Sequence, residues 1–227
     1  MAIIVGDIHG DIEKTRAFLA YKPEQEHVAL GDYLDSYIEP VERQIKCLHL
    51  LMDSDTILLL GNHECHYLKN PLFQFAGYQI NQADILQSIL ETNIDRFKVA
   101  YVTDGWLLTH AGVHRGIADK QNDVTVLANL FNSCWKLYLN NRQDGYRYKS
   151  IFRFDFMIEG SFAPTNITQI FGHMEHTRPI VETNYIALDT TNCSNSCWLF
   201  DTVEYELVQL PLEPKVDRVR FQGGGWM

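Results

Sequence analysis

The first sixty residues alternate short apolar runs with amphipathic segments, and this alternation restricts the fold more than any other feature of the chain. The apolar runs at 2–5, 27–30 and 56–60 have the length of strands. Between them, 11–21 and 40–52 have the apolar spacing of helices, and an aspartate stands at the N-cap position of the first. This order of strand, helix, strand, helix and strand predicts a parallel α/β sheet.

Each of these three strands ends in a glycine followed by polar side chains. The pairs are Gly6-Asp7, Gly31-Asp32 and Gly61-Asn62. In open α/β sheets, ligand sites form beyond the carboxyl ends of the strands. We therefore expect the three polar clusters to converge at one edge of the sheet.

The later part of the chain has a different pattern. Residues 81–98 and 123–140 are expected to be mostly helical. Short strand candidates separated by turn residues lie at 106–109, 167–171, 180–181, 185–188, 197–200 and 205–209. They predict a second sheet, largely antiparallel, packed against the first. We find no internal repeat or linker, so a single domain over 1–227 is expected.

Charge and composition limit the partners of the chain. Its 227 residues include 19 Lys and Arg and 29 Asp and Glu, for a net charge of −10. This balance argues against long nucleic acid as a partner. We see no apolar run that would cross a membrane and no secretory signal. The five scattered cysteines fit reduced thiols, so we expect a cytoplasmic protein; they are Cys47, Cys65, Cys134, Cys193 and Cys197.

The segment GDIHG at 6–10 places an acid and an imidazole directly after the first strand. Alternate residues of an extended chain point the same way, so Asp7 and His9 can share a face. Together they suit a divalent cation such as Mn, Zn or Fe. The alternative is a solvated turn in which Asp7 caps the next segment.

Further short motifs follow strands in the same way. They are GDYLDS at 31–36, GNHE at 61–64, THAG at 109–112 and GH at 172–173. Their carboxylates and imidazoles are too many for one tetrahedral ion and suit transition metals of intermediate hardness. Two neighbouring ions need a shared carboxylate with ligands on both sides. These residues can supply such a pair.

The ordered set GDIHG, GDxxD, GNHE, HAG and GH resembles the calcineurin-like metallophosphoesterases. It is most similar to the branch of phosphoprotein phosphatases, their phage and bacterial relatives, and symmetrical diadenosine tetraphosphate hydrolases. The motifs span residues 6 to 173, about three quarters of the chain. The resemblance implies an α/β fold, a sandwich of two mixed β-sheets flanked by helices.

The resemblance also implies the metal ligands. Asp7 and His9 would hold the first ion, and Asp32 would bridge both. The second ion would be completed by Asn62, His110 and His173. Manganese is the expected metal, and Fe, Zn or Ni also suit such a site.

The resemblance assigns the reaction step to two further residues. His63 would be the general acid for the leaving oxygen, and Asp35 would orient it. A hydroxide bridging the metals would attack phosphorus in line. An imidazole with a pKa near neutrality suits proton donation. The alternative for His63 is a third ligand or a buried hydrogen-bonded imidazole.

The chain departs from the family at the substrate clamp. The family usually has Arg-Gly after GDxxD, and this chain has Ser36-Tyr37. Serine cannot make the bidentate phosphate contact of arginine. We expect the clamp to be altered while the metal site is retained.

Three arginines are candidates to replace the missing clamp. Arg153 resembles the second phosphate-binding arginine of phosphatase relatives, and we expect it to bind phosphate. Its alternative role is an ion pair with Asp155. Arg115 and Arg178 are expected to be solvated charges at the rim.

The last motif also departs from the family, which commonly reads GHT followed by Pro. This chain reads GHMEHTRP, so His173 is the expected ligand and His176 its rival. Four histidines lie off the pattern. His66 and His114 are expected near the site without binding metal or on the surface, and His27 and His49 in structural roles.

We expect a phosphomonoesterase similar to the serine/threonine protein phosphatases, acting on phosphoproteins or small phosphorylated molecules. The first alternative is hydrolysis of a dinucleoside polyphosphate or another phosphodiester, because loss of the arginine weakens recognition of a terminal dianion. The second is a non-catalytic metal-binding scaffold. The presence of both Asp35 and His63 argues against a scaffold, since neither is needed merely to hold metal.

Overall fold

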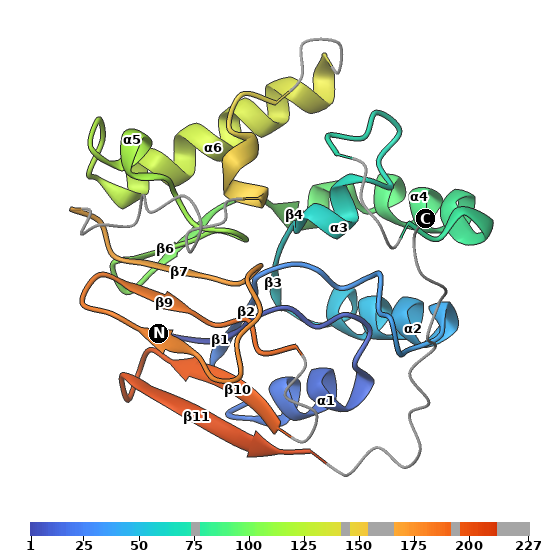
Figure 1. Cartoon of the computed structure of the whole chain (residues 1–227), viewed down its shortest axis with the longest axis horizontal. Coiled ribbons are helices and arrows are strands. Elements are labelled where there is room, and N and C mark those ends of the chain that lie inside the picture. Colours follow the sequence, from blue (N-terminus) through green and yellow to red (C-terminus); the bar gives the residue numbers. More distant parts are fainter. Residues whose placement is uncertain (74–77, 142–145, 154–165, 192–195, 213–227) are drawn as a thin grey trace, which may run out of the picture.

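A computed structural model (Figure 1) describes residues 1–73, 78–141, 146–153, 166–191 and 196–212 of the chain. Two mixed β-sheets face each other, and helices cover them, as the resemblance implied. Among the described residues, no helix has the length and apolar character needed to span a membrane.

The first sheet has six strands in the order β11-β10-β1-β2-β3-β4. Strands β1, β2, β3 and β4 are parallel, and β10 runs antiparallel to β1. The strand bounds are β1 Ala2–Val5, β2 Glu26–Ala29, β3 Ile57–Leu59, β4 Phe97–Lys98, β10 Ser196–Asp201 and β11 Glu206–Pro211. The parallel strands place their carboxyl ends at the same edge.

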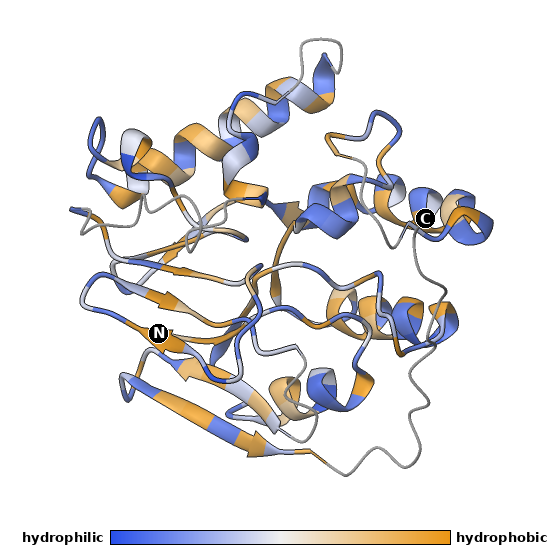
Figure 2. Ribbon diagram, in the orientation of Figure 1, coloured by the Kyte–Doolittle hydropathy of each residue, from blue (hydrophilic) through white to orange (hydrophobic). Residues whose placement is uncertain are grey.

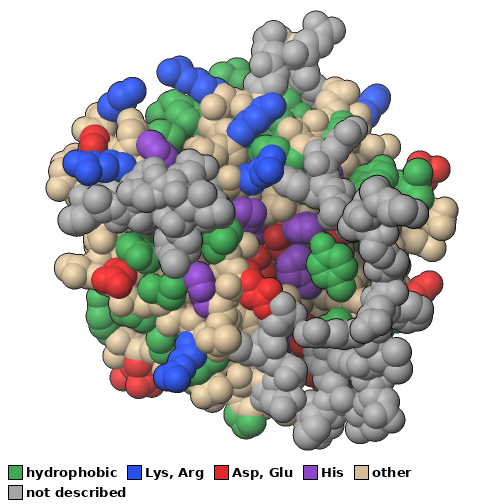
Figure 3. All heavy atoms as spheres, in the orientation of Figure 1, with side chains coloured by type: hydrophobic (Ala, Val, Ile, Leu, Met, Phe, Trp, Pro, Cys, Tyr) green, Lys and Arg blue, Asp and Glu red, His purple; other side chains and the backbone are tan. Residues whose placement is uncertain are grey.

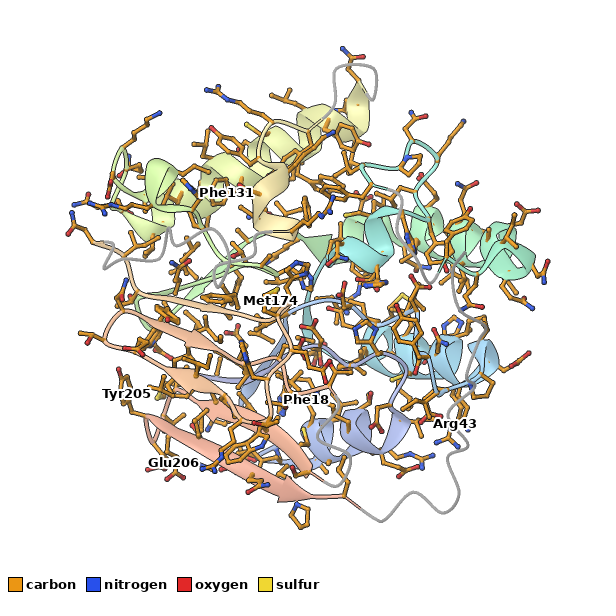
Figure 4. The ribbon with its side chains drawn as sticks, in the orientation of Figure 1. Phe18, Arg43, Phe131, Met174, Tyr205 and Glu206 are labelled. Atoms are coloured by element: carbon orange, nitrogen blue, oxygen red, sulfur yellow. The ribbon has the colours of Figure 1, made fainter. Side chains whose placement is uncertain are left out.

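Helices α1 (Ile12–Ala20) and α2 (Val41–Met52) pack side by side and against the first sheet. Helix α1 begins where the Asp11 carboxylate accepts the backbone N–H groups of Glu13 and Lys14, at 3.2 and 3.1 Å. Phe18, labelled in Figure 4, comes from α1 and is fully buried in the core between helices and sheet. Helices α3 (Asn62–Cys65) and α4 (Ala83–Thr92) follow β3.

The second sheet has five strands in the order β5-β6-β7-β9-β8. The strand bounds are β5 Tyr101–Thr103, β6 Trp106–Leu108, β7 Gln169–Phe171, β8 Ile180–Val181 and β9 Tyr185–Ala187. The inner strands β6, β7 and β9 are parallel, and the edge strands β5 and β8 are antiparallel. Helix α6 (Val124–Asn140) contacts β5 and β6, and the short α5 (Arg115–Ala118) precedes it.

The first sheet is buried on both faces. Ile3 and Val5 of β1 point into the core beneath the helices, whereas Ala2 and Ile4 point into the core between the sheets. Leu108 and Ile170 of the second sheet belong to that same inner core. Figure 2 shows the resulting concentration of hydrophobic residues along the strands.

The observed topology confirms the parallel start and corrects the prediction for the later strands. The second sheet is mixed rather than largely antiparallel, because three of its strands are parallel neighbours. Strands β10 and β11 join the first sheet instead of the second. Strands β4 and β5 were not predicted, since two and three residues are too few to show a strand period.

Candidate metal centre

The polar clusters at the strand ends meet in space. Asp7 and His9 follow β1, Asp32 follows β2, Asn62 and His63 follow β3, His110 follows β6, and His173 follows β7. Figure 3 shows histidine and acidic side chains gathered in one hollow on this face. The two sheets therefore contribute to one site through the same ends of their parallel strands.

Several of these residues have a left-handed backbone. The φ angles are 45° at His9, 51° at Asp32, 59° at Asp35 and 69° at His173. Non-glycine residues rarely adopt such angles, and they persist where the surrounding structure holds them. The sharp turns bring side chains from the strand ends back toward one point.

Two glycines of the motifs are required by close approach. A Cβ on Gly61 would lie 2.0 Å from Asp32 Oδ1, and one on Gly172 would lie 2.0 Å from Asp7 Oδ1. Neither clash can be relieved without moving a buried carboxylate. The glycines of GNHE and GH thus allow the backbone to pass beside the two acids.

Asp32 lies at the centre of the cluster. Its Oδ2 is 3.4 Å from His110 Nε2, 3.8 Å from His9 Nε2 and 3.9 Å from His63 Nε2. Two groups of potential metal ligands share this carboxylate. One is His9, Asp32 and His63, and the other is Asp32, His110 and His173.

Asn62 joins the second of these groups. Its Oδ1 is 2.9 Å from His110 Nε2 and 2.8 Å from His173 Nδ1. Donor atoms bound about 2.1 Å from one ion lie roughly 3 to 3.5 Å from one another. The spacing of these oxygen and nitrogen atoms fits a divalent transition metal.

Asp7 lies beside the cluster without belonging to either group of three. Its carboxylate accepts the backbone N–H of His173, at 3.0 Å to Oδ1. Burial and the nearby Asp189 carboxylate raise the pKa of Asp7 well above its usual value. The buried ammonium of Lys14 donates to the Asp7 carbonyl.

Opposing charges set the protonation of the central residues. Burial raises the pKa of Asp32, but the positive charges of His110 and His63 outweigh it and hold the pKa well below its usual value. Burial lowers the pKa of His110, but Asp32 and Asp7 raise it to about 10. Burial and the charge of His110 lower the pKa of His173 to about 3. The negative charge of Asp32 therefore interacts favourably with several neighbouring imidazoles at once.

His63 is held by Asp35. Its Nδ1 donates to Asp35 Oδ2 over 2.8 Å, which leaves Nε2 on the side of Asp32. Burial lowers the pKa of His63, but the carboxylates of Asp32 and Asp35 raise it to about 9. The two carboxylates thus favour the protonated imidazole, which is the form that can donate a proton.

Glu64 has a role that the sequence did not reveal. Its carboxylate is fully buried and accepts four backbone N–H groups, from Asp32 (2.9 Å), Tyr33 (2.8 Å), Leu34 (3.2 Å) and Gly61 (3.0 Å). It ties the loop after β2 to the loop after β3. The motifs GDYLDS and GNHE were visible in the sequence, but they did not show which backbone N–H groups would donate to Glu64.

A cleft of about 200 Å³ opens over the cluster. Six carboxylates line it: Asp11, Asp32, Asp35, Glu39, Glu175 and Asp189. Its described lining includes three histidines and no lysine or arginine. Such a cleft attracts divalent cations and repels a free phosphate, so an anionic substrate needs bound cations there.

The family model described as calcineurin-like phosphoesterase matches residues 2–217. The chain belongs to the calcineurin-like phosphoesterase family. It is a metal-dependent phosphoester hydrolase with candidate ligand clusters formed by histidine and aspartate.

A solved structure has the same fold as this phosphoesterase. It is a protein serine/threonine phosphatase from Saccharomyces cerevisiae, described as similar to human phosphatase PP5. The TM-score is 0.54 at 13% identity, over 95% of this chain and 80% of that chain. In a comparison with curated proteins, none matched this chain.

The phosphoesterase has Ser36 and Tyr37 at the mouth of its cleft. The Ser36 hydroxyl accepts the backbone N–H groups of Ile38 and Glu39, at 3.2 and 2.9 Å, and so shapes the turn. Tyr37 is 72% exposed and lines the cleft. The position of the usual arginine is thus occupied by a turn-forming serine followed by an exposed aromatic ring.

Arg153 lies near the cluster from another direction. It is exposed and follows the short helix Lys149–Phe152. The Ile151 carbonyl of this helix accepts the backbone N–H of Ala111 over 2.7 Å, directly after His110. The charge of Arg153 contributes to lowering the pKa of His173. Asp155, its alternative partner, lies outside the described residues.

The remaining arginines and the rival histidine lie elsewhere. Arg115 is exposed and pairs with Asp119 over 3.1 Å, and Arg178 is exposed. The backbone N–H of His176 donates to the Asp189 carbonyl, and His176 is in none of the groups of potential ligands found among the described residues.

The other histidines have varied surroundings. His27 is buried, and its ring contacts the carbonyls of Gln25 and Phe18. His114 accepts the backbone N–H of Gly116 at the start of α5, and His49 is exposed in α2. His66 contacts Asp35 instead of facing the cleft.

Proposed function

We propose that the phosphoesterase binds two divalent ions. Asp7, His9 and Asp32 would hold the first. The second would be held by Asp32, Asn62, His110 and His173. The observation that carries this proposal is the Asp32 carboxylate, which two groups of potential ligands share. The oxygen and imidazole donors suit Mn, and also Fe, Zn or Ni.

The bound ions would supply an activated water and neutralise charge on the phosphoryl oxygens. The residues of the chain supply the remaining chemistry. His63 Nε2 would give its proton to the leaving oxygen, because its Nδ1 is already engaged by Asp35. His110 Nδ1 donates to the Leu30 carbonyl over 2.9 Å, which turns its Nε2 toward Asn62 Oδ1, where both atoms can serve as ligands.

The proposed substrates are phosphomonoesters, including phosphoproteins and small phosphorylated molecules. Family membership and the His63–Asp35 pair support this choice. The fold shared with the yeast serine/threonine phosphatase agrees with it. Arg153 is our proposed phosphate contact, since the helix before it is hydrogen-bonded to Ala111 directly after His110 and its charge acts on His173. A cytoplasmic location would suit the buried free thiols of Cys47, Cys65 and Cys197.

A second candidate is hydrolysis of a dinucleoside polyphosphate or another phosphodiester. The exposed Tyr37 ring at the cleft mouth favours it, because a base or aryl group could stack there. The described lining of the cleft has no cation to hold a terminal dianion. A diester carries less charge on the phosphoryl group and has less need of such a cation.

Parallel hydrolysis assays with added Mn test these proposals. The substrates are an aryl phosphomonoester, an aryl phosphodiester, diadenosine tetraphosphate and a phosphopeptide, each with a chelated control. Chelator-sensitive turnover that is fastest on the monoester or phosphopeptide supports the first proposal. Faster turnover of the diester or tetraphosphate supports the second. Bound metal without turnover on any substrate would favour a non-catalytic scaffold.

Replacing His63 with alanine is expected to lower turnover while leaving metal bound. General acids contribute roughly 10²- to 10⁴-fold to rate, so a loss in this range is expected. Turnover and metal content, the latter by mass spectrometry of the metals, measure the two effects. An unchanged turnover would remove His63 from the mechanism.

Replacing Arg153 with alanine is expected to weaken phosphate binding more than it lowers turnover. Loss of one exposed charge contact is worth about 1 kcal/mol, or roughly fivefold in the phosphate inhibition constant. Arg115→Ala is the matched control, because Arg115 is exposed and ion-paired with Asp119. Equal inhibition constants for the Arg153 variant and the unmodified protein would refute the assignment.

A further inference from the structure

Imidazole nitrogens of two histidines contact the same carboxylate oxygen of Asp35. Its Oδ2 is 2.8 Å from His63 Nδ1 and 2.5 Å from His66 Nε2. The hydroxyl of Tyr67 donates to the other oxygen, Oδ1, over 2.5 Å. Three side chains thus hold one buried carboxylate, and only His63 among them lines the cleft.

The local helix explains how both histidines reach Asp35. Helix α3 starts at Asn62 and is one turn long, and His66 is its C-cap residue. His63 and His66 are three residues apart, so their side chains lie on the same face of this turn. The sequence HECH therefore presents two rings to one acid.

His66 is rigidly packed. Its side chain is fully buried. Its ring makes perpendicular contacts with Tyr67 and Tyr78, with centroids 4.4 and 5.2 Å away. Tyr67 and Tyr78 stack on each other at 4.9 Å, and the Tyr67 hydroxyl accepts the backbone N–H of Gln79. The aromatic rings leave His66 little freedom to turn away from Asp35.

Asp35 needs such support because it lies in a loop. Its φ of 59° is in the left-handed region, and it follows β2 by several residues. A carboxylate with one donor can rotate about its Cβ–Cγ bond. Tyr67 holds Oδ1, and His66 Nε2 lies against Oδ2 beside His63 Nδ1, so His66 restricts where the oxygen that holds the His63 ring can lie.

We propose that His66 is a positioning residue for the general acid His63, acting through Asp35. This inference rests on the proposed function, in which His63 protonates the leaving oxygen. His66 itself is buried behind Asp35 and does not line the cleft. Removing its donor would loosen Asp35 and misplace the His63 proton, and small misplacements of a reacting group can cost up to about 100-fold in rate.

The leaving group of the substrate separates this role from a structural one. Nitrophenolate leaves without a proton, whereas the phenolate of phenyl phosphate benefits from one. His66→Phe keeps the aromatic packing and removes the donor. We expect it to lower kcat on phenyl phosphate by about 10- to 100-fold, with a much smaller fall on p-nitrophenyl phosphate and little change in KM. His66→Gln restores a donor near the position of Nε2 and should recover most of the loss.

His49→Gln is the matched control, because His49 is exposed in α2 and is not among the described residues that line the cleft. It should behave as the unmodified protein on both substrates. Equal losses on the two substrates, or no recovery in His66→Gln, would overturn the proposal. Loss of one equivalent of metal in His66→Phe would overturn it too, since Asp35, His63 and His66 would then be ligands of an ion.

A measurement without substrate tests the same role independently of catalysis. Nitrogen NMR of the metal-free protein reports whether the proton on Nδ1 of His63 is protected from exchange with solvent, with His63→Gln used to assign the signal. We expect Nδ1 of His63 to hold a slowly exchanging proton that is lost in His66→Phe and retained in His66→Gln. An unchanged signal in His66→Phe would refute the positioning role even if the protein hydrolyses neither ester.

Discussion

Asp32→Asn is expected to abolish turnover and to lower the metal content at both positions. The amide has nearly the same shape as the carboxylate but lacks its charge, which the two groups of ligands share. Metal ions contribute several kcal/mol to such reactions, so roughly a thousandfold loss or more is expected. Turnover with saturating Mn and the metal content of the purified variant measure the effect.

Asp84→Asn provides the control, because Asp84 is exposed in the first turn of α4. It makes the same chemical change away from the cluster. Retention of two equivalents of metal by Asp32→Asn would contradict a bridging role. Loss of activity with one equivalent retained would assign Asp32 to a single ion.

Glu64→Ala is expected to destabilise the fold strongly. It would leave four buried backbone N–H groups without their acceptor. Each unsatisfied buried donor costs about 1–3 kcal/mol, so a loss of roughly 4 kcal/mol or more is expected. That is a large share of the stability of a typical domain.

Urea unfolding of the metal-free protein measures this loss without reference to activity. Glu24→Ala is the control, since Glu24 is an exposed glutamate. Glu64→Gln keeps one acceptor oxygen and should fall between the two. A Glu64→Ala midpoint equal to that of Glu24→Ala would show that solvent or other groups satisfy the four donors.

The alternation in the first sixty residues was sufficient to predict β1, α1, β2, α2 and β3 within one or two residues. Strongly apolar strands and capped helices can be predicted from neighbouring residues alone, and the tertiary structure keeps them. Asp11 is an example, because it caps α1 as predicted. No comparable local pattern shows which sheet each of the later strands joins. The pattern of 197–200 fits either sheet, and only long-range pairing of Leu199 with Val5 assigns β10 to the first.

The candidate site divides in the same way. Asp7, His9, Asp32, Asn62, His63, His110 and His173 were predicted because the motifs place them at strand ends, where parallel strands must bring them together. Their roles as ligands or acid stay predictions. His66 was expected near the site without binding metal, but its contact with Asp35 was not predicted, and the supporting residues Glu64 and Asp189 were missed. Each of them interacts with a residue that is distant in the sequence, and only the packing of the folded chain brings the two together.

The amino-acid sequence by itself determined the family, the parallel half of the first sheet and the residues offered at its edge, because these depend on local periodicity and short motifs. The tertiary structure decided the rest. It showed that Asp32 is shared by two ligand groups, that Glu64 ties two loops together, and that Asp35 receives two imidazoles. Such contacts depend on distances of a few ångströms between separate segments, which a linear pattern does not encode.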